Sequence, residues 1–446
     1  MGEDSFNIGG FDLNAFLNAA GDDPVTGFYY IFIHGGWIIF LYVAWIIARM
    51  MWLEWRQGLN VSKKQWMLLR IQVPKATEQT PRAMENMFAH FAGAHSPTSW
   101  TERWIGGNVQ SAISLEIASL EGRVQFFIRF EKRLRNFIES AIYAQYPDAE
   151  IEEAEDYTKL VPHHWPDEDW DFYGTEMIPV KDDAYSLKTY PEFEDAVSGE
   201  FKDPLAAVLE NFSHIGRGEY VWYQIVITPT DQKDARARAE KVLNKLKGIK
   251  VEAKKTTLDH IIDIPIKAVE TVFDAVLGIE REPPKKKDEK SAFPKLMSMT
   301  KGEQFIIESI ERKAGKIGFL TKIRFAYAGK KTVFQKARAL QPFIGAIKQM
   351  NTFHMQALKP ESKHVGINAT LWWFKDARNN HRRNHFLHAY MGRSNWSGIT
   401  PYMLSSEELA TLWHFPILTQ VKAPSLDRTA AKKTDAPFNI PFSDEE

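Results

Sequence analysis

The residues of this 446-residue chain that could do chemistry lie in one basic run and in two acidic clusters. The basic run, residues 375–393, reads KDARNNHRRNHFLHAYMGR and is expected to form a loop. Its guanidinium groups could contact the phosphates of a nucleic acid or dock on an acidic partner. A solvated connector is the alternative, because charged runs usually face water. The candidate phosphate contacts are Arg378, Arg382, Arg383 and Arg393.

The acidic clusters suggest a metal site or a pair of catalytic carboxylates, and neither is predicted. His163 and His164 precede several acids, but adjacent histidines on a loop rarely converge on one ion. The acids of residues 152–156 fit an exposed strand edge protected by charge better than acid–base catalysis. The sequence has no GxxxxGK[ST] phosphate cradle, no GxSxG and no cysteine. We therefore expect no catalytic residue, no metal and no cofactor.

A short capped helix is predicted within residues 404–416. Ser405 or Ser406 can act as its N-cap, and Glu407 and Glu408 lie near the positive end of the helix dipole. Taken alone, this pattern favours a helix that packs inside its own domain. Its apolar face and its end are formed by Leu409, Leu412, Trp413, Phe415 and Pro416.

The elements that position these residues begin with an apolar stretch, Phe28–Ala48, which carries no formal charge. A helix of this length crosses a hydrocarbon layer of about 30 Å, so a transmembrane helix is predicted over residues 28–52. Residues 1–27 contain acids but no lysine or arginine, whereas basic residues follow the stretch. The positive-inside rule then places the N-terminus outside the cell and the bulk of the chain in the cytoplasm. A buried hairpin helix of a soluble protein is the alternative.

Two α+β units are expected after the membrane segment. Residues 57–157 alternate as strand, helix, hairpin, helix and strand, the βαββαβ order of a ferredoxin-like unit. Residues 158–202 are interpreted as a linker with a strand pair, Met177–Val180 and Tyr185–Tyr190. A second α+β unit is expected over 203–360, with an insertion at 249–300 whose helix 261–277 suits lipid or a partner helix. A C-terminal strand, basic loop and helix are expected over 361–420, before a disordered tail over 421–446.

Three strings of the sequence are similar to a known class of bacterial proteins. They are SSEELATLWHFP, IQVPKATEQTPRAMENMFAHF and TKIRFAYAGKKTVFQKARAL, and the likeness spans roughly residues 65 to 420. The chain resembles the membrane-proximal α+β region of type IV secretion and conjugative transfer proteins, which ends just before a HerA/FtsK-like ATPase core. The core and its phosphate cradle are missing from this sequence. The resemblance implies the anchoring half of a split system, with the motor on a separate polypeptide.

The expected protein is therefore α+β, with a single N-terminal transmembrane helix and two ferredoxin-like units. Its expected function is a non-catalytic scaffold in the bacterial inner membrane that recruits or orients a separate P-loop ATPase. The resemblance also implies a homo-oligomer and assigns docking on the ATPase to the helix at Glu407 and Glu408. The alternative function is a membrane-tethered module that binds nucleic acid through residues 375–393. A formal net charge of −1 gives no global field in favour of nucleic acid.

Overall fold

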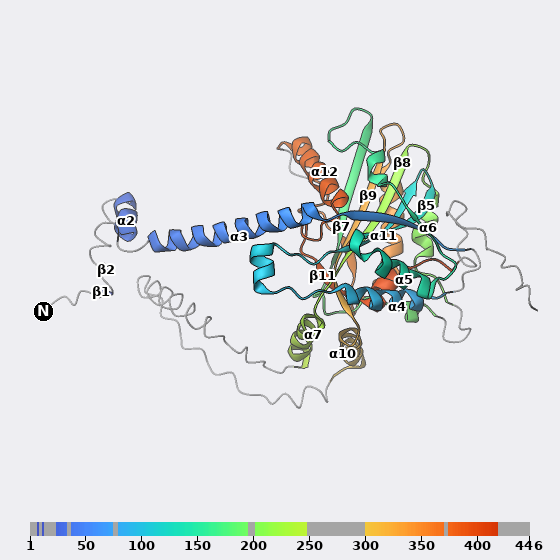
Figure 1. Ribbon diagram of the computed structural model, residues 1–446, viewed down its shortest axis with the longest axis horizontal. Helices are drawn as coiled ribbons and strands as arrows, with labels where there is room; N and C mark the ends of the chain where they lie inside the picture. The colour runs from blue at the N-terminus through green and yellow to red at the C-terminus, as the bar shows by residue number, and fades with distance from the viewer. Residues whose placement is uncertain are drawn as a thin grey trace, which may run out of the picture. The chain divides into compact units, whose positions relative to one another are not determined.

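The computed structural model describes residues 7–8, 11–12, 24–33, 37–74, 79–194, 201–247, 299–369 and 373–417. These residues form an α+β protein with a large antiparallel sheet (Figure 1). The chain divides into two compact units, of which unit 1 consists of Met1–Gln65 and Ser96–Gln110, and unit 2 of Trp66–His95 and Ser111–Glu446. The expected helix 261–277 and the expected disordered tail lie outside the described residues.

Unit 1 is built around the long helix α3 (Trp37–Lys63). A shorter helix, α2 (Pro24–Ile31), precedes α3, and β1 (Asn7–Ile8) pairs with β2 (Phe11–Asp12). The second part of the unit contributes one turn of π-helix, η3 (Glu102–Gly106).

The apolar stretch that was predicted to cross a membrane is divided between two helices. Its residues belong to α2 and α3, and residues 34–36 between them lie outside the described residues. No helix in the described part of the chain combines the length and the apolar character that crossing a bilayer requires. Within α3 the uncharged run from Trp37 to Ala48 covers about 18 Å at a rise of about 1.5 Å per residue. The transmembrane helix 28–52 therefore stays a prediction.

Unit 2 contains one antiparallel sheet to which nine strands of the described residues contribute. From edge to edge the order is β10-β7-β9-β8-β4-β5-β3-β6, and β11 also pairs with β9. The strands are β3 (Trp66–Gln72), β4 (Ile113–Leu120), β5 (Arg123–Glu131), β6 (Glu150–Glu153), β7 (Trp170–Pro179), β8 (Glu219–Pro229), β9 (Gly318–Lys330), β10 (Leu358–Pro360) and β11 (Tyr402–Ser405).

The two halves of the sheet have the same strand order. In the first half the strands lie side by side in the order β6, β3, β5, β4. Counted along the sequence of this half, this is the order fourth, first, third, second. In the second half β10, β7, β9 and β8 repeat this order. The halves join where β4 pairs with β8 along eight residue positions, from Ile113↔Ile227 to Leu120↔Tyr220. The two expected units are therefore parts of one continuous sheet.

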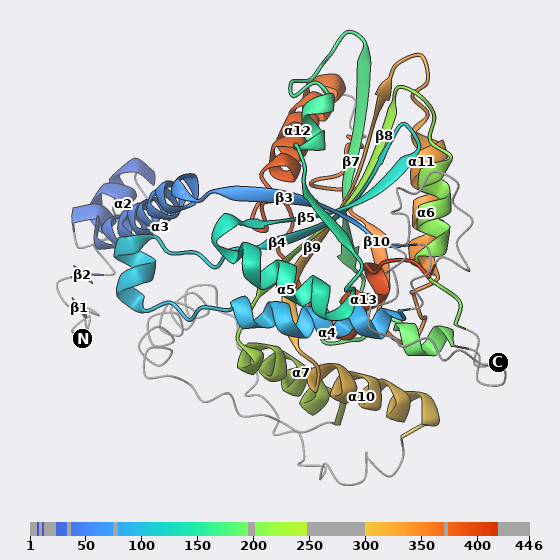
Figure 2. The ribbon, with the colours of Figure 1, turned by 45° about the vertical axis from the view of Figure 1, so that its right-hand side comes forward.

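Helices cover both faces of this sheet (Figure 2). α6 and α11 pack on one another and on one face, and α12 packs against β7 on the opposite face. The helices of unit 2 are α4 (Pro81–Phe91), α5 (Arg135–Gln145), α6 (Ala206–Ser213), α7 (Gln232–Lys247), α10 (Lys301–Ala314), α11 (Lys336–Lys348), α12 (Lys375–Met391) and α13 (Ser406–Leu412).

Two sequence predictions about unit 2 are wrong. Within residues 158–202 the expected strand Met177–Val180 is only the end of β7, which begins at Trp170, where a linker was expected, and pairs with β9 over eight positions and with β10 at its end. Tyr185–Tyr190, the expected partner strand, is not extended in the sheet. The expected basic loop 375–393 is largely helix α12. β7 and α12 meet at Gly174, where a Cβ atom would overlap the Phe386 ring, so this glycine allows their close approach.

Candidate functional site

Large apolar side chains are exposed along α3 of unit 1 from Trp37 to Trp55, a stretch in which Arg49 and Glu54 are the charged residues. At 100° per residue the exposed large side chains are spread around the whole circumference of the helix. Ile38 and Leu41 expose 57% and 59% of their surface, and Met50 exposes 67%. A helix that is hydrophobic all round belongs in a protein core or in lipid. We name this surface the apolar band; it consists of Trp37, Ile38, Leu41, Tyr42, Val43, Trp45, Ile47, Met50, Met51, Trp52 and Trp55.

One stripe of α3 binds the segment that contains η3. Trp52 Nε1 donates to Trp104 O at 3.1 Å, and Arg56 Nε donates to Ile105 O at 2.7 Å. Further along, Asn60 Nδ2 donates to Asn108 Oδ1 at 3.0 Å. Lys64 Nζ, directly after the end of α3, donates to Val109 O at 2.9 Å. These donors recur every four residues and therefore lie on one helix face.

Gly107 makes this attachment possible. Its φ of +69° is in the left-handed region, where only glycine is free of steric strain. A Cβ atom at this position would overlap the carbonyl oxygen of Arg56. The backbone of the η3 segment therefore approaches α3 more closely than any other residue would allow.

Indole rings and guanidinium groups gather where the apolar band ends. The Arg49 guanidinium lies 4.5 Å from the Trp104 ring and 5.5 Å from the Trp45 ring. Arg56 lies 5.9 Å from the rings of Trp52 and Trp55. Tryptophan and arginine are suited to the headgroup level of a bilayer, where a ring and a charge both find favourable surroundings. We name this cluster the aromatic collar; it consists of Trp45, Arg49, Trp52, Trp55, Arg56, Trp100 and Trp104.

In unit 2, the predicted docking helix α13 is buried. Ser405, one of the two expected N-cap residues, caps the helix and forms a capping box with Glu408. Leu409, Leu412 and Trp413 are fully buried, however, and Phe415 exposes only 2% of its surface. Trp413 stacks edge-on against Phe126 of β5, at 5.7 Å between ring centroids. The prediction that these residues, with Pro416, form a docking surface does not agree with this burial.

The two glutamates of α13 have ion-pair partners inside unit 2. Lys313 Nζ lies 3.0 Å from Glu408 Oε2, and both side chains are almost fully buried. Glu408 also accepts a hydrogen bond of 2.8 Å from the backbone of Leu187. Glu407 contacts Arg312 and lies 3.2 Å from Lys316 Nζ. The adjacent carboxylates therefore fasten α13 to α10.

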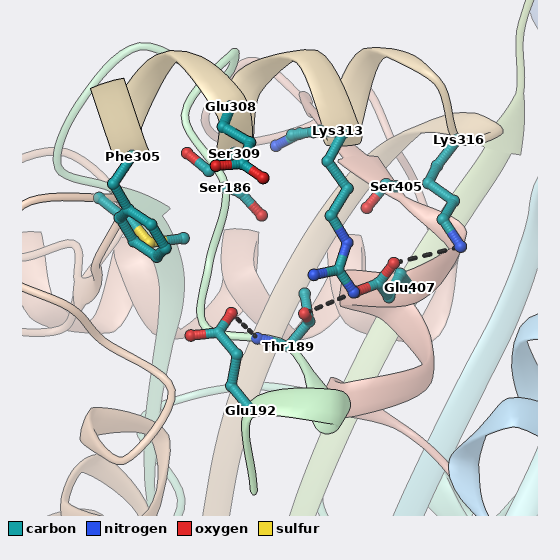
Figure 3. Close-up of a pocket in the computed structure, with 12 residues that line it drawn as sticks. Ser186, Thr189, Glu192, Phe305, Glu308, Ser309, Lys313, Lys316, Ser405 and Glu407 are labelled. Carbon is teal, nitrogen blue, oxygen red and sulfur yellow. Dashed lines mark hydrogen bonds and ion pairs between the residues drawn. The ribbon is translucent and has the colours of Figure 1, made fainter. Parts of the chain in front are cut away.

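A cavity of about 160 Å³ opens beside Glu407 (Figure 3). Thr189 donates a hydrogen bond of 2.6 Å to the Glu407 carboxylate at its inner end. Phe305 and Met355 give the cavity an apolar part, and Glu308 and Glu192 add carboxylates. Phe305 exposes 49% of its surface. The mixture of apolar, acidic and basic groups suits a peptide side chain better than a phosphate, because the cations already bind carboxylates.

The arginines expected to contact phosphate have internal partners. Arg382 donates to the backbone oxygens of Gly366 and Lys363 at 2.8 and 2.7 Å. Arg383 donates to Phe172 O and lies 2.7 Å from Asp171. These bonds join α12 to its own domain and leave the two guanidinium groups largely occupied. Arg378 is half-buried.

Arg393 lies inside unit 2, between two carboxylates. Its Nε is 2.9 Å from Glu116 Oε1, and its other nitrogens bind Asp156. Burial alone would raise the pKa of Glu116, but the charge and hydrogen bonds of Arg393 hold this pKa below its usual value. Burial would lower the pKa of Arg393, but Glu116 raises it well above the usual value. Tyr157 and Tyr390 bond to one another beside the pair at 2.8 Å, and burial raises the pKa of both.

The Glu116 carboxylate belongs to a polar row across the hydrophobic sheet. Glu116, Gln224 and Arg324 are cross-strand neighbours on β4, β8 and β9, and Glu176 follows on β7. Arg324 Nε lies 3.0 Å from Glu176 Oε1, and Gln224 bonds to both Glu116 and Arg324 at 3.2 Å. Arg324 also donates to Ser394 O beyond the end of α12. Sequence reasoning missed this row; charged residues inside otherwise apolar strands were the available signal.

The remaining acidic clusters agree with a structural role. In the described part of the chain, no group of three or more histidine and carboxylate side chains could hold a metal ion. His163 and His164 are exposed. Glu152 on β6 pairs with Arg70 of β3 and lies at the sheet edge, where protective charge was expected.

A protein-family model, described as a domain of unknown function (DUF8128), matches residues 54–425. No curated protein matches the chain.

Proposed function

The chain belongs to the DUF8128 family, a domain of unknown function, and we propose that it is a scaffold attached to a membrane. The observation that carries this proposal is the apolar band of α3. Burying one large apolar side chain contributes roughly 1.5–3 kcal/mol. Exposed apolar patches of this extent mark contact with lipid or with another protein. Lipid is the partner that can cover every side of a helix at once.

Charge supports an orientation for this attachment. The sequence before α2 carries acids only, whereas Arg49, Arg56, Lys63 and Lys64 follow the uncharged part of α3. By the positive-inside rule, unit 2 would then lie in the cytoplasm and the N-terminus outside, with the bacterial inner membrane as the location. A full crossing needs about 30 Å of apolar helix, so α3 would have to act together with the residues before it.

Vesicle flotation of the full-length chain tests the attachment. Leu41→Lys with Ile47→Lys places two charges in the apolar band, and we expect most of the protein to lose flotation. The matched control, Val180→Lys with Phe353→Lys, changes two exposed apolar side chains of unit 2 and should float like the wild type. The proposal would be contradicted if the apolar-band variant floated as well as the control variant, or if the wild-type chain did not float at all.

We further propose that unit 2 binds a separate HerA/FtsK-like ATPase, as the resemblance of its sequence implies, and that several copies of the chain assemble around it. Because α13 is buried, the contact is assigned to the cavity beside Glu407 and to the exposed Phe305 of α10. A half-exposed aromatic ring beside a mixed cavity is typical of an interface anchor.

The partner test uses a purified HerA/FtsK-like ATPase from the same organism and measures its binding by calorimetry. We expect Phe305→Asp to weaken the complex at least tenfold, and Trp396→Asp, a change of another exposed ring of unit 2, to leave it unchanged. If both changes weakened ATPase binding equally, the contact could not be assigned to the cavity beside Glu407. Absence of any complex, or ATP turnover by this chain alone, would contradict the scaffold.

The nucleic-acid alternative has less support. Arg382, Arg383 and Arg393, three of its four candidate residues, already bind carboxylates or backbone oxygens of unit 2. Phosphate contacts would have to replace these bonds. Salt-sensitive DNA binding that is lost in Arg382→Ala with Arg383→Ala would revive this alternative.

We also infer that each half of the sheet is a ferredoxin-like unit. The support is their common strand order, fourth-first-third-second, with helices in the crossovers. The second half departs from the pattern, because its second and third strands, β8 and β9, are joined through α7 and α10 and not by a hairpin.

A further inference from the structure

We propose that the η3 segment, residues 99–106, is a second membrane contact that lies in the headgroup layer beside α3. This inference rests on the proposed membrane attachment and adds to it a contact that no apolar stretch of the sequence indicates. Its occupant is the lipid interface, and three observations within unit 1 support it.

The first observation is that the segment is fixed to α3. Side chains of α3 donate hydrogen bonds to its backbone: Trp52 to Trp104 O, Arg56 to Ile105 O and Asn60 to Gly106 O. Gly107 brings the two backbones into direct contact at Arg56. A segment that is held in this way shares the depth of the helix positions to which it is bound.

The second observation concerns that depth. The uncharged run of α3 ends at Ala48, so Arg49 is the first charge after it. In a bilayer this charge would lie at the phosphates, because an arginine in the hydrocarbon core is costly. The Arg49 guanidinium lies 4.5 Å from the Trp104 ring of η3. The segment is bound at Trp52 and Arg56, within about two turns after Arg49, and therefore lies at the level where the uncharged run of α3 has ended and the headgroups begin.

The third observation is the outward side of the segment. Although its backbone is bound to α3, Trp100 exposes 70% of its surface and Ile105 exposes 60%. Trp100 stacks loosely on Trp104 at 6.4 Å, which extends the aromatic collar away from the helix. Large apolar side chains on a fixed segment, next to an exposed apolar helix, form one continuous surface.

Lipid fits this surface better than a second protein does. Cations exceed acids around it, with Arg49, Arg56, Lys63, Lys64 and Arg103 against Glu54 and Glu102. Indole rings with adjacent guanidinium groups match the mixture of phosphate, carbonyl and hydrocarbon at a bilayer surface. With two points of contact, the helix could neither slide along the membrane normal nor roll about its axis.

Single-cysteine labelling of the full-length protein tests the inference, because the chain has no cysteine of its own. Trp100→Cys and Ile105→Cys each carry an environment-sensitive fluorophore. Leu41→Cys reports on the apolar band, and Phe353→Cys, an exposed position of unit 2, is the aqueous control. The proteins are reconstituted in vesicles of phosphatidylcholine and phosphatidylglycerol whose acyl chains are brominated near the headgroup or near the methyl end.

We expect shallow bromines to quench the probes at 100 and 105 by at least twofold, deep bromines to quench the probe at 41, and neither to quench the probe at 353. Probes at 100 and 105 that behave like the probe at 353, while the probe at 41 is quenched, would overturn this inference and leave the membrane attachment intact. Probes at 100 and 105 shielded from both bromines and aqueous iodide would indicate a protein cover and would also overturn it. An unquenched probe at 41 would remove the attachment itself.

Discussion

Arg393 and Glu116 form an ion pair in the interior of unit 2, with Arg393 Nε 2.9 Å from Glu116 Oε1. The pair joins the end of α12 to the middle of the sheet, across 277 positions of sequence. Its partners are themselves bonded, since Asp156 binds the same guanidinium and Gln224 binds the same carboxylate. Removing one member leaves a buried charge that has lost its main partner, whereas removing both leaves none.

The first prediction follows from this asymmetry. We expect Arg393→Met to lower the free energy of unfolding by about 3–5 kcal/mol. Arg393→Met with Glu116→Gln should recover part of this loss, because the buried carboxylate is then neutral. Urea unfolding of unit 2, followed by circular dichroism, measures both values. Lys363→Met, at an exposed position, is the control. A loss below about 1 kcal/mol for Arg393→Met would show that the pair does not hold α12 in place.

The second prediction concerns Gly107 in unit 1. Gly107→Ala forces a Cβ atom against the Arg56 carbonyl at a φ of +69°, so we expect the η3 segment to separate from α3. Hydrogen exchange of the amides of 102–108 should become faster by tenfold or more. Gly58→Ala is the matched control, because a Cβ atom there meets nothing within 4 Å and alanine favours the helix. Unchanged exchange in the Gly107 variant would mean that the segment is not held by this contact.

The third prediction tests the contact between β7 and α12. In Gly174→Ala the new methyl group overlaps the Phe386 ring, and we expect a loss of about 1–3 kcal/mol from overpacking. Gly174→Ala with Phe386→Leu should recover stability, because the smaller side chain makes room for the methyl group. Gly345→Ala in α11, where a Cβ atom has open space, should not destabilise the protein. Urea unfolding midpoints of the four proteins give the comparison.

The fourth prediction is a pH dependence that comes from Glu361. Burial alone would raise the pKa of this carboxylate, but backbone N–H groups of residues 363–366 lower it to about 2. The unfolded pKa is about 4.3, so the folded state binds fewer protons between the two values and stability falls as the pH falls from about 5 to 2. The contribution at neutral pH is about 3 kcal/mol.

We therefore expect Glu361→Gln to be less stable than the wild type at pH 7, and the difference to narrow towards pH 2. Glu168→Gln, which removes an exposed carboxylate, should show no such convergence. Denaturant unfolding at a series of pH values provides the measurement. A stability difference that stays constant with pH would assign the effect of Glu361→Gln to lost packing and not to the charge.

The elements with strong local signals were predicted well from the sequence. Proline at the start of α4 and its apolar spacing gave the correct helix, and the alternating strands β4 and β5 were found with their turn. In that turn both Glu121 and Gly122 have positive φ, which is the geometry of a two-residue hairpin. The mostly apolar run of β8 is long and has no glycine or proline before Pro229, which is typical of a buried strand.

The errors have a common physical cause, which is that the compensating groups are distant in sequence. β7 was predicted only at its end, as Met177–Val180, because Gly174 and Glu176 weaken the strand pattern before it. The Phe386 ring explains the glycine, and Arg324 compensates the buried glutamate. The docking surface was assigned to α13 by resemblance, and the buried Lys313 of α10 that pairs with Glu408 lies 95 positions away in the sequence. The local sequence indicates that burying a charged residue is costly, but it does not indicate which distant residue of opposite charge compensates for the burial.

The burial of α13 has a consequence for how the protein is made. Trp413 and Phe415 are buried in the core of unit 2, where they pack on Phe126 of β5, a strand from the first third of the chain. A ribosome releases this segment among the last residues of the domain, so the sheet cannot close its core while the chain is still short. Before that point the apolar band of α3 has long left the exit tunnel. The membrane attachment of α3 that we propose would thus precede completion of unit 2, and a truncation before residue 406 should yield an open, protease-sensitive body.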